Sequence, residues 1–577
     1  MDTALKTIDR FSGSLLYRYL LIIFLVLLAY GNTLNHGFVW DDFDIIVENP
    51  TLQLKNIPRF FVSEDRISSP TGYYRPVTYI SFALDRAIWG TNPVGFNITN
   101  LLLHLLAVLL FYRVVAALFK RENLALLAAL LFALHPIAGE TVNFHAGGRN
   151  TLLCACFSLA SLLFYVNRKS LPAVACFTLG IFSKEFALLL PAILFLYDRT
   201  LNEERPKWSA YLPYAVASAV YLLMRSLVVK ANANLIKAAN VVDNIWIVPQ
   251  TIVTYLRNMV LPFYLKTLYY VNLQVTWSVF LTCTFLIVLL LVVAFVFRKK
   301  REILFAVVIF LLFLLPVTNI FYLGAAMIAD RHAYLASLGF SLALAWAICS
   351  AKKQVAVPVA VALCAAFVVT DIARNAAWRD EISLFEQMAK DAPELSTGYQ
   401  NLGVIYYNRQ DFPAAEKYLM LALDKEGLYD TALDGFTGMF IEMGKPDKAV
   451  LAVARKMKNN PKNPEPYFVL SRIYEATGNG ELARTNRDQA EALFPGAAEA
   501  MRNKVVEACR QGEALMSRRS FARAESLFDA ALTLDPYSVP ALLDMGSVMV
   551  EKGDAGKAER YFARAAALAP RDPADKP

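Results

Sequence analysis

The chain has 577 residues, of which 57% are hydrophobic and 18% are charged, and it carries a net charge of +8. Soluble domains are usually about 45–50% apolar, so this composition excludes an ordinary soluble protein and predicts a membrane protein. The positive charge does not indicate nucleic-acid binding, because most Lys and Arg residues lie in short loops between apolar runs. The seven cysteines form no CxxC pair, which argues against a disulfide framework or a structural zinc site.

The first apolar run covers residues 15–34 and has basic residues before it. It contains no small-residue cleavage site, so we expect an uncleaved membrane span with a cytoplasmic N-terminus. Residues 35–96 then form a long polar and aromatic segment, and loops of this length are usually functional. This first outer loop also contains the sequence Tyr73-Tyr74-Arg75-Pro76.

An acidic pair, Asp41 and Asp42, follows Trp40 at the start of that loop. Charge close to a bilayer is costly, so an acidic pair there is a candidate functional site. The alternative is a solvated loop whose carboxylates cap the next helix.

Further apolar runs predict a total of eleven membrane spans, since a span needs roughly 20 residues with a range down to about 17. The two short runs at 170–184 and 186–198 are interpreted as a tight hairpin with Lys184 and Glu185 at its tip. The ten runs after the first are 97–119, 122–138, 150–167, 170–184, 186–198, 208–229, 277–297, 303–320, 333–350 and 354–371.

Alternation of these spans places all the basic loops on the cytoplasmic side, in agreement with the positive-inside rule. The densest cluster is 298–301. Counting 246–262 as a span would move that cluster outside, so we expect this segment to be interfacial or re-entrant. Eleven spans put the C-terminal tail opposite the N-terminus, in the periplasm of a bacterium or the lumen of the endoplasmic reticulum.

The tail contains a repeat of 34 residues. A spacing of 34 residues relates Ala415, Ala449 and Ala483, and the same spacing relates Ala524 and Ala558, with about seven additional residues between the two groups. Small, aromatic and Pro residues recur around each Ala as in tetratricopeptide (TPR) repeats, including Pro570 in the fifth. We therefore predict a soluble helical solenoid of about five repeats at 396–570, after a membrane domain at 1–372 and a connector at 373–395.

Polar groups gather on the outer face in this topology. They are suited to sugar transfer from a lipid phosphate, because an Asp can take a proton from an acceptor hydroxyl and cations can hold a departing phosphate. Neither a GxSxG motif nor a phosphate-binding Gly loop is present. The candidates are Asp41 and Asp42 as catalytic carboxylates, and Arg75, His135, Glu140, Arg149, Lys184, Glu185 and Arg331 as donor-binding or second-loop residues.

Ordered motifs in the sequence resemble a known family. They are GFVWDD at 37–42, YYRPVTYISFALDRAIWG at 73–90, LHPIAGETVNFHAGGRNTLL at 134–153, FSKEFALLLP at 182–191 and DRHAYLASLGF at 330–340. Followed by TPR repeats, they resemble the transmembrane and tetratricopeptide-repeat O-mannosyltransferases and their bacterial relatives, which are multi-spanning glycosyltransferases of the C superfamily (GT-C).

This resemblance implies an all-α GT-C membrane domain, a polyprenyl-phosphate sugar donor and an acceptor hydroxyl. Because TPR arrays form a concave groove that binds extended peptides, we expect the array to select a protein acceptor, and the alternative is an arm that docks an unrelated partner. The resemblance also implies a catalytic carboxylate in the first outer loop, for which we choose Asp41, and no metal cofactor. A divalent ion held by Asp41, Asp42 and Glu140 is the alternative. One departure is Asn97, where relatives often carry a His.

Two other functions remain open from the sequence. A non-enzymatic scaffold would use the membrane helices as an anchor and the repeats to recruit partners, but it has no need of clustered outer carboxylates and cations. A transporter would place polar residues near the middle of the bilayer on broken helices, whereas here they lie at the outer ends of the runs.

Overall fold

The computed structural model describes residues 15–62, 73–202, 207–229, 245–271, 275–319 and 328–568. In these residues the regular elements are helices, apart from a single β-bridge between Leu395 and Glu426. The prediction of an all-α fold is confirmed. The chain divides into two compact units, Met1–Ala392 and Pro393–Pro577, and the predicted connector at 373–395 falls almost entirely within the first.

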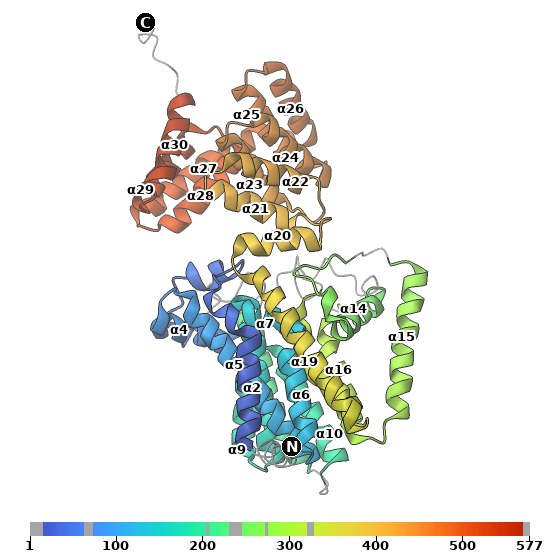
Figure 1. Ribbon diagram of the computed structural model, residues 1–577. Coiled ribbons are helices and arrows are strands. Elements are labelled where there is room, and N and C mark those ends of the chain that lie inside the picture. Colours follow the sequence, from blue (N-terminus) through green and yellow to red (C-terminus); the bar gives the residue numbers. More distant parts are fainter. Residues whose placement is uncertain are drawn as a thin grey trace, which may run out of the picture. The chain divides into compact units, whose positions relative to one another are not determined.

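The first unit is a bundle of apolar helices (Figure 1). Its α-helices in the described ranges are α2 (Leu15–Tyr30), α3 (Arg59–Val62), α4 (Pro76–Trp89), α5 (Pro93–Phe119), α6 (Glu122–Leu134), α7 (Gly139–Asn143), α8 (His145–Val166), α9 (Ser170–Ser183), α10 (Leu190–Thr200), α11 (Leu212–Val228), α14 (Val248–Val260), α15 (Trp277–Val296), α16 (Arg301–Leu314), α17 (Asp330–Ala333), α18 (Ala336–Cys349), α19 (Lys353–Asn375) and α20 (Glu381–Asp391).

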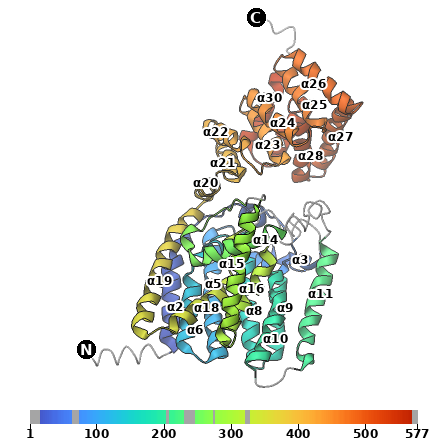
Figure 2. The ribbon, with the colours of Figure 1, turned by 90° about the vertical axis from the view of Figure 1, so that its right-hand side faces the viewer.

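The core of this unit is formed by α5, α6, α8 and α18, whose apolar side chains are buried against one another. Helix α16 crosses α18 closely at Gly339, where an added Cβ would lie 2.3 Å from the carbonyl oxygen of Ala306. Helices α2 and α19 pack side by side (Figure 2). Helix α15 lies at the edge, with Cys283 as its one buried residue.

Every predicted apolar run contains a helix. By length and composition, six helical segments in the described ranges could cross a membrane, and a seventh if α6 and the segment after it, bent by 49°, form one span. Helices α9 and α18 are apolar but have only 14 residues each. The eleven-span topology therefore stays a prediction, and so does the interfacial placement of α14.

Two ion pairs join the loops that were predicted to be cytoplasmic. Arg18 at the start of α2 contacts Glu122 at 2.7 Å, and Arg121 beside it contacts Glu302 at the start of α16 at 2.8 Å. The turn between α15 and α16 lies at the lower end of the bundle in Figure 1, whereas α4 and α7 lie at the upper end. The basic loops and the acidic loop are thus at opposite ends of this unit.

The second unit is a stack of five helix pairs, as the repeat pattern predicted. The pairs are α21 (Ser396–Asn408) with α22 (Phe412–Leu423), α23 (Asp430–Glu442) with α24 (Pro446–Asn459), α25 (Glu465–Ala476) with α26 (Gly480–Leu493), α27 (Ala497–Ser517) with α28 (Phe521–Leu534), and α29 (Val539–Glu551) with α30 (Ala555–Leu568).

The additional residues between the third and fourth repeats lengthen α27, which has 21 residues against 13 in α29. All five repeat alanines are buried. Gly512 permits the close crossing within the fourth pair, because an added Cβ would lie 2.3 Å from the ring of Phe528. Pro570 lies outside the described residues.

Candidate active site

The acidic loop is ordered by a small apolar cluster of its own. Phe38 and Ile46, on either side of the acidic pair, are buried against Phe82 of α4 and Phe96 of α5. A short helical turn at Phe43–Val47 follows the pair. The sequence around the carboxylates therefore fixes their backbone against the membrane bundle, rather than leaving a solvated loop.

Asp42 is fully buried and has a structural role in this arrangement. One carboxylate oxygen accepts from the backbone N–H of Ala146 at 2.7 Å, and the other from the ring of His145 at 2.9 Å. Both residues belong to the first turn of α8, where backbone N–H groups lack helical partners and a negative charge is favoured. Asp42 thus caps the N-terminus of α8, although it lies about 100 residues earlier in the sequence.

His145 has acceptors at both ring nitrogens. Its second nitrogen lies 2.8 Å from the amide oxygen of Asn97. The orientation of that amide is set because its NH₂ group donates to the backbone carbonyls of Leu34 and His36 at 3.2 and 2.8 Å. The Asp42 carboxylate and the Asn97 amide oxygen therefore hold the His145 ring from both sides. Asn97, the departure from the family pattern, completes this network.

Asp41 points instead into a cavity of about 130 Å³. Asp41 is exposed, in contrast to the buried Asp42. Burial raises the pKa of Asp41 to about 6; the charge of Arg331 opposes this rise, and Asp42 and Asp44 add to it. A carboxylate of this pKa is a usable base near neutral pH. Other residues that line the cavity include Tyr73, Arg75, Phe144, Asn150, Lys184, Glu185, Asn319, Arg331 and His332.

Arg75 and Glu185 form a bidentate pair in this cavity, with nitrogen to oxygen distances of 2.7 and 3.2 Å. Arg75 lies directly before Pro76, the first residue of α4, and Glu185 follows α9. Burial alone would raise the pKa of Glu185, but the Arg75 charge outweighs it and lowers the pKa to about 2. The first loop and the α9–α10 hairpin therefore meet at the cavity.

Lys184 is buried beside this pair and donates to the hydroxyl of Thr151 at 2.8 Å. Burial lowers the pKa of Lys184 to about 7, as does the charge of Arg75, while Glu185 opposes the shift. Unlike Arg75, Lys184 has no carboxylate within ion-pair distance among the described residues. An anion in the cavity would favour its charged form.

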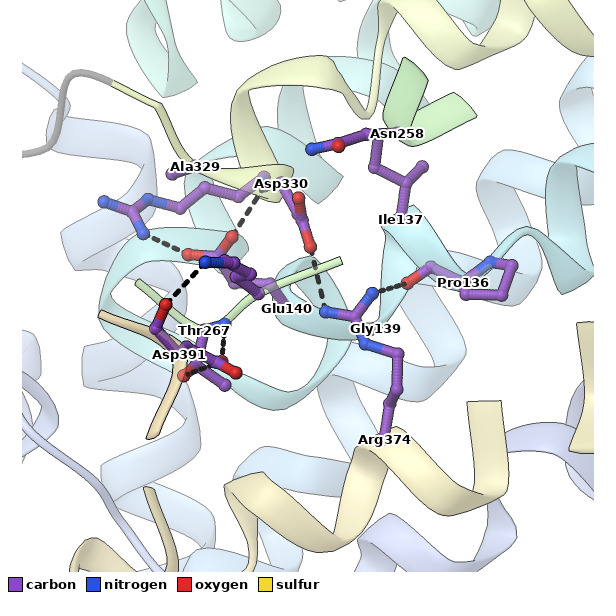
Figure 3. A network of polar contacts seen from close by, with 12 residues as sticks. Pro136, Ile137, Gly139, Glu140, Asn258, Thr267, Ala329, Asp330, Arg374 and Asp391 are labelled. Carbon is purple, nitrogen blue, oxygen red and sulfur yellow. Dashed lines mark hydrogen bonds and ion pairs between the residues drawn. The ribbon is translucent and has the colours of Figure 1, made fainter. Parts of the chain in front are cut away.

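Arg331 is the third cation that lines the cavity, after Arg75 and Lys184, and it comes from a distant part of the chain. Its guanidinium pairs with Glu140, and its backbone N–H donates to the same carboxylate at 2.9 Å. Figure 3 shows Glu140 next to Asp330, whose carboxylate binds Arg374 of α19 at 2.9 Å. Glu140 thus holds Arg331 toward the cavity and does not line the cavity itself.

His332 also lines the cavity, although it is not among the candidate residues chosen from the sequence. Its Nδ1 atom is buried and has no hydrogen-bond partner among the residues that the structure describes. Burial lowers the pKa of His332 well below its usual value, and the cations Arg331, Lys184 and Arg75 lower it further. It stands in the DRHAYL motif beside Arg331, so the motif could have identified it.

Two further candidates lie outside the cavity. His135 donates to the carbonyl of Met259 at 2.9 Å and accepts from the N–H of Ile137 at 3.2 Å. Arg149 is fully buried and contacts Asp85 at 2.7 Å, joining α8 to α4. The structure therefore assigns both residues to packing between helices.

The three carboxylates of the alternative metal site do not converge. Asp42 is bound to α8, Glu140 is bound to Arg331, and Asp41 alone faces the cavity. In the part of the chain that the structure describes, no group of three or more His, Cys, Asp or Glu side chains has the geometry to hold a metal ion.

Residues 75–230 match the family model of the dolichyl-phosphate-mannose-protein mannosyltransferases, and residues 515–575 match a tetratricopeptide-repeat model. The protein O-mannosyl-transferase F38B6.6 of Caenorhabditis elegans is 25% identical over 438 residues, which cover 71% of this chain and 63% of that protein. The protein O-mannosyl-transferase TMTC4 of Mus musculus is 37% identical over 168 residues, covering 25% of this chain and 22% of that protein.

The chain therefore spans less than two thirds of the length of these relatives. Among solved structures, yeast Tom70 aligns with 81% of this chain and 92% of its own at 14% identity and a TM-score of 0.17.

Proposed function

We propose that this chain, which belongs to the TMTC-like family of protein O-mannosyl-transferases, transfers a sugar from a polyprenyl-phosphate-linked donor to a Ser or Thr hydroxyl of a protein. The observation that carries the proposal is a single cavity that joins a carboxylate of raised pKa, Asp41, to three cations from three separate segments. A scaffold needs no such arrangement.

In the proposed reaction Asp41 takes the proton of the acceptor hydroxyl while the hydroxyl oxygen attacks the anomeric carbon of the sugar. The bond between that carbon and the phosphate oxygen breaks, and polyprenyl phosphate leaves with the bonding electron pair. No general acid is needed, because the phosphate leaves as a stable anion. A positioned base of this kind contributes typically about 10²–10⁴-fold to the rate.

The phosphate would be held by Arg75, Lys184 and Arg331. The two arginines already have carboxylate partners, so their charges are partly balanced and their guanidinium groups are fixed in place. Lys184 has no carboxylate partner among the described residues, so the phosphate itself would balance the charge of its ammonium group. Cations that are positioned before the reaction stabilise charge as it develops on the leaving group.

We further propose that the repeats bind the acceptor protein. Solenoids of this kind present an extended concave surface suited to peptide segments. The chain enters the repeats after α20, which lies at the acidic-loop end of the first unit, as its Phe385 contacts Trp40. We place the protein in the bacterial inner membrane with its repeats in the periplasm, or in the endoplasmic reticulum in a eukaryote.

The test is sugar transfer by the purified full chain in detergent, with a polyprenyl-phosphate mannose as donor and secreted proteins from the same cells as acceptors. Intact mass of each acceptor should increase by whole hexose units, and the Asp41→Asn variant should reduce the modified fraction by about 10²–10⁴-fold at equal reaction time. Failure of the wild-type chain to modify any acceptor, with donor bound, would leave the scaffold as the better explanation.

A further inference from the structure

Helix α20 is the last element before the repeats, and two separate sets of contacts join it to the two sides of the cavity. The first set is aromatic. Trp40 stacks on Phe144 at a centroid distance of 5.9 Å and meets the edge of Phe385 of α20 at 6.3 Å. Phe144 in turn stacks on Trp378, which precedes α20, at 5.8 Å. The rings of two chain segments thus enclose Trp40.

The backbone conformation of Trp40 depends on these surrounding rings. Its φ angle is +53°, in the left-handed region that is disfavoured for residues with a Cβ. Such a conformation persists where surrounding contacts over-determine it. The neighbouring backbone is also held, because the N–H of Gly37 donates to the carbonyl of Arg379 at 2.8 Å. Asp41 is the next residue, so the position of the Trp40 ring determines where the carboxylate lies.

The second set of contacts is polar and begins at Asp391, the last residue of α20 (Figure 3). Its carboxylate accepts from the backbone N–H and the hydroxyl of Thr267 at 2.7 and 2.8 Å. Its carbonyl accepts from the ammonium group of Lys266 at 2.6 Å. The segment that follows α14 is therefore fixed to the end of α20.

That segment extends the contacts to Arg331. The backbone N–H of Lys266 donates to the hydroxyl of Tyr269 at 3.0 Å, and this hydroxyl donates to Asp330 at 2.6 Å. Asp330 directly precedes Arg331 in α17. The aromatic contacts thus end at the proposed base, and the polar contacts end at one of the proposed phosphate ligands.

We propose that α20 positions the site from both sides, with Phe385 as a positioning residue for Asp41 and Asp391 as a positioning residue for Arg331. This inference rests on the proposed function. It makes the last helix of the first unit a part of the catalytic framework rather than a passive connector. Phe385 acts through Trp40 on the chemical step, and Asp391 acts through Tyr269 and Asp330 on donor binding.

The two roles predict different kinetics. In the full-length protein, Phe385→Ala should lower kcat about 10-fold to 10²-fold at nearly unchanged KM for the donor, because the base is displaced by an ångström or less. Asp391→Ala should mainly raise the KM for the donor, because Arg331 is displaced from the donor phosphate. That contact is made in both the ground state and the transition state. Phe385→Tyr and Asp391→Asn, which keep the ring and an acceptor oxygen, should restore most of each loss.

Matched controls lie on the same helix. Met388→Ala removes an equally buried apolar side chain, and Lys390→Gln changes an exposed residue beside Asp391. Hydrogen exchange of the full chain gives a readout that needs no transfer: Phe385→Ala should speed exchange within 38–47, and Asp391→Ala within 328–333, each more than Met388→Ala does.

The inference would be overturned if Phe385→Ala and Asp391→Ala exchanged no faster than Met388→Ala in these segments. It would also be overturned if the loss of activity in each variant followed its melting temperature, with kcat and KM changing together. Failure of the proposed function has a different signature. The wild-type chain would then transfer no sugar, or Asp41→Asn would transfer it normally, while the selective changes in exchange persisted.

Discussion

The buried carboxylate of Asp42 lies 2.9 Å from the ring of His145, and that contact separates two acids that are adjacent in the sequence. Asp42 is used to join the first loop to α8. Asp41, one residue earlier, is left facing the cavity with a pKa of about 6. The pair therefore divides into a structural member and the proposed base.

This division gives the first prediction. Asp41→Asn should reduce transfer by about 10²–10⁴-fold with little change in melting temperature, since Asn has nearly the same shape and cannot take a proton. Asp42→Asn should destabilise the protein by about 1–3 kcal/mol, because the NH₂ group that replaces one carboxylate oxygen cannot accept a hydrogen bond and leaves a buried contact at His145 or Ala146 unmade. Thermal melts and transfer rates measured on the same preparations check both. Normal transfer by a stable Asp41→Asn variant would contradict the base assignment.

The sequence was sufficient to predict the helical runs, the repeats and the candidates that line the cavity. Asp41, Arg75, Lys184 and Arg331 come from four segments, and their motifs identified them one by one. The distinction between Asp41 and Asp42 could not be predicted, because it depends on which carboxylate meets the N-terminus of α8. The placement of Arg149 depended likewise on Asp85, a partner that spacing along the chain does not indicate.

The second prediction concerns pH. Asp41 accepts a proton only when ionised, above its pKa of about 6, and Lys184 is a cation only below its pKa of about 7. The ratio kcat/KM should therefore rise with pH to a maximum between these values and then fall. Initial rates at subsaturating donor across this range measure it. A flat profile through pH 6 would exclude Asp41 as the titrating base.

The third prediction separates charge from shape at Lys184. Lys184→Met keeps most of the side-chain volume but removes the charge, so it should weaken donor binding and remove the alkaline limb of the pH profile. Met also leaves the Thr151 hydroxyl without its donor, so melting temperature is recorded alongside. Arg18→Met, which removes a cation at the other end of the bundle, is the control. Unchanged donor affinity in Lys184→Met would show that the phosphate is held elsewhere.

The fourth prediction concerns topology. The basic turn between α15 and α16 should be cytoplasmic, because its charges and those of the other basic loops lie at one end of the bundle. A cysteine introduced at Lys299 should resist an impermeant thiol reagent in intact cells, and one introduced at Asn49, in the acidic loop, should react. Each is made in a background without the native cysteines. Labelling at Lys299 but not at Asn49 would reverse the orientation and contradict the outer-face site.

The last prediction tests the two units separately. Truncation after Ala392 keeps α20 with its contacts to Trp40 and Thr267, so the cavity should remain intact and bind donor normally. Transfer to a short Ser- or Thr-containing peptide should persist, whereas transfer to the full acceptor protein should fall, because the repeats no longer bind it. Truncation after Asn375 removes α20 as well and should abolish transfer to both acceptors. Undiminished transfer to the protein acceptor by the first truncation would show that the repeats dock a different partner.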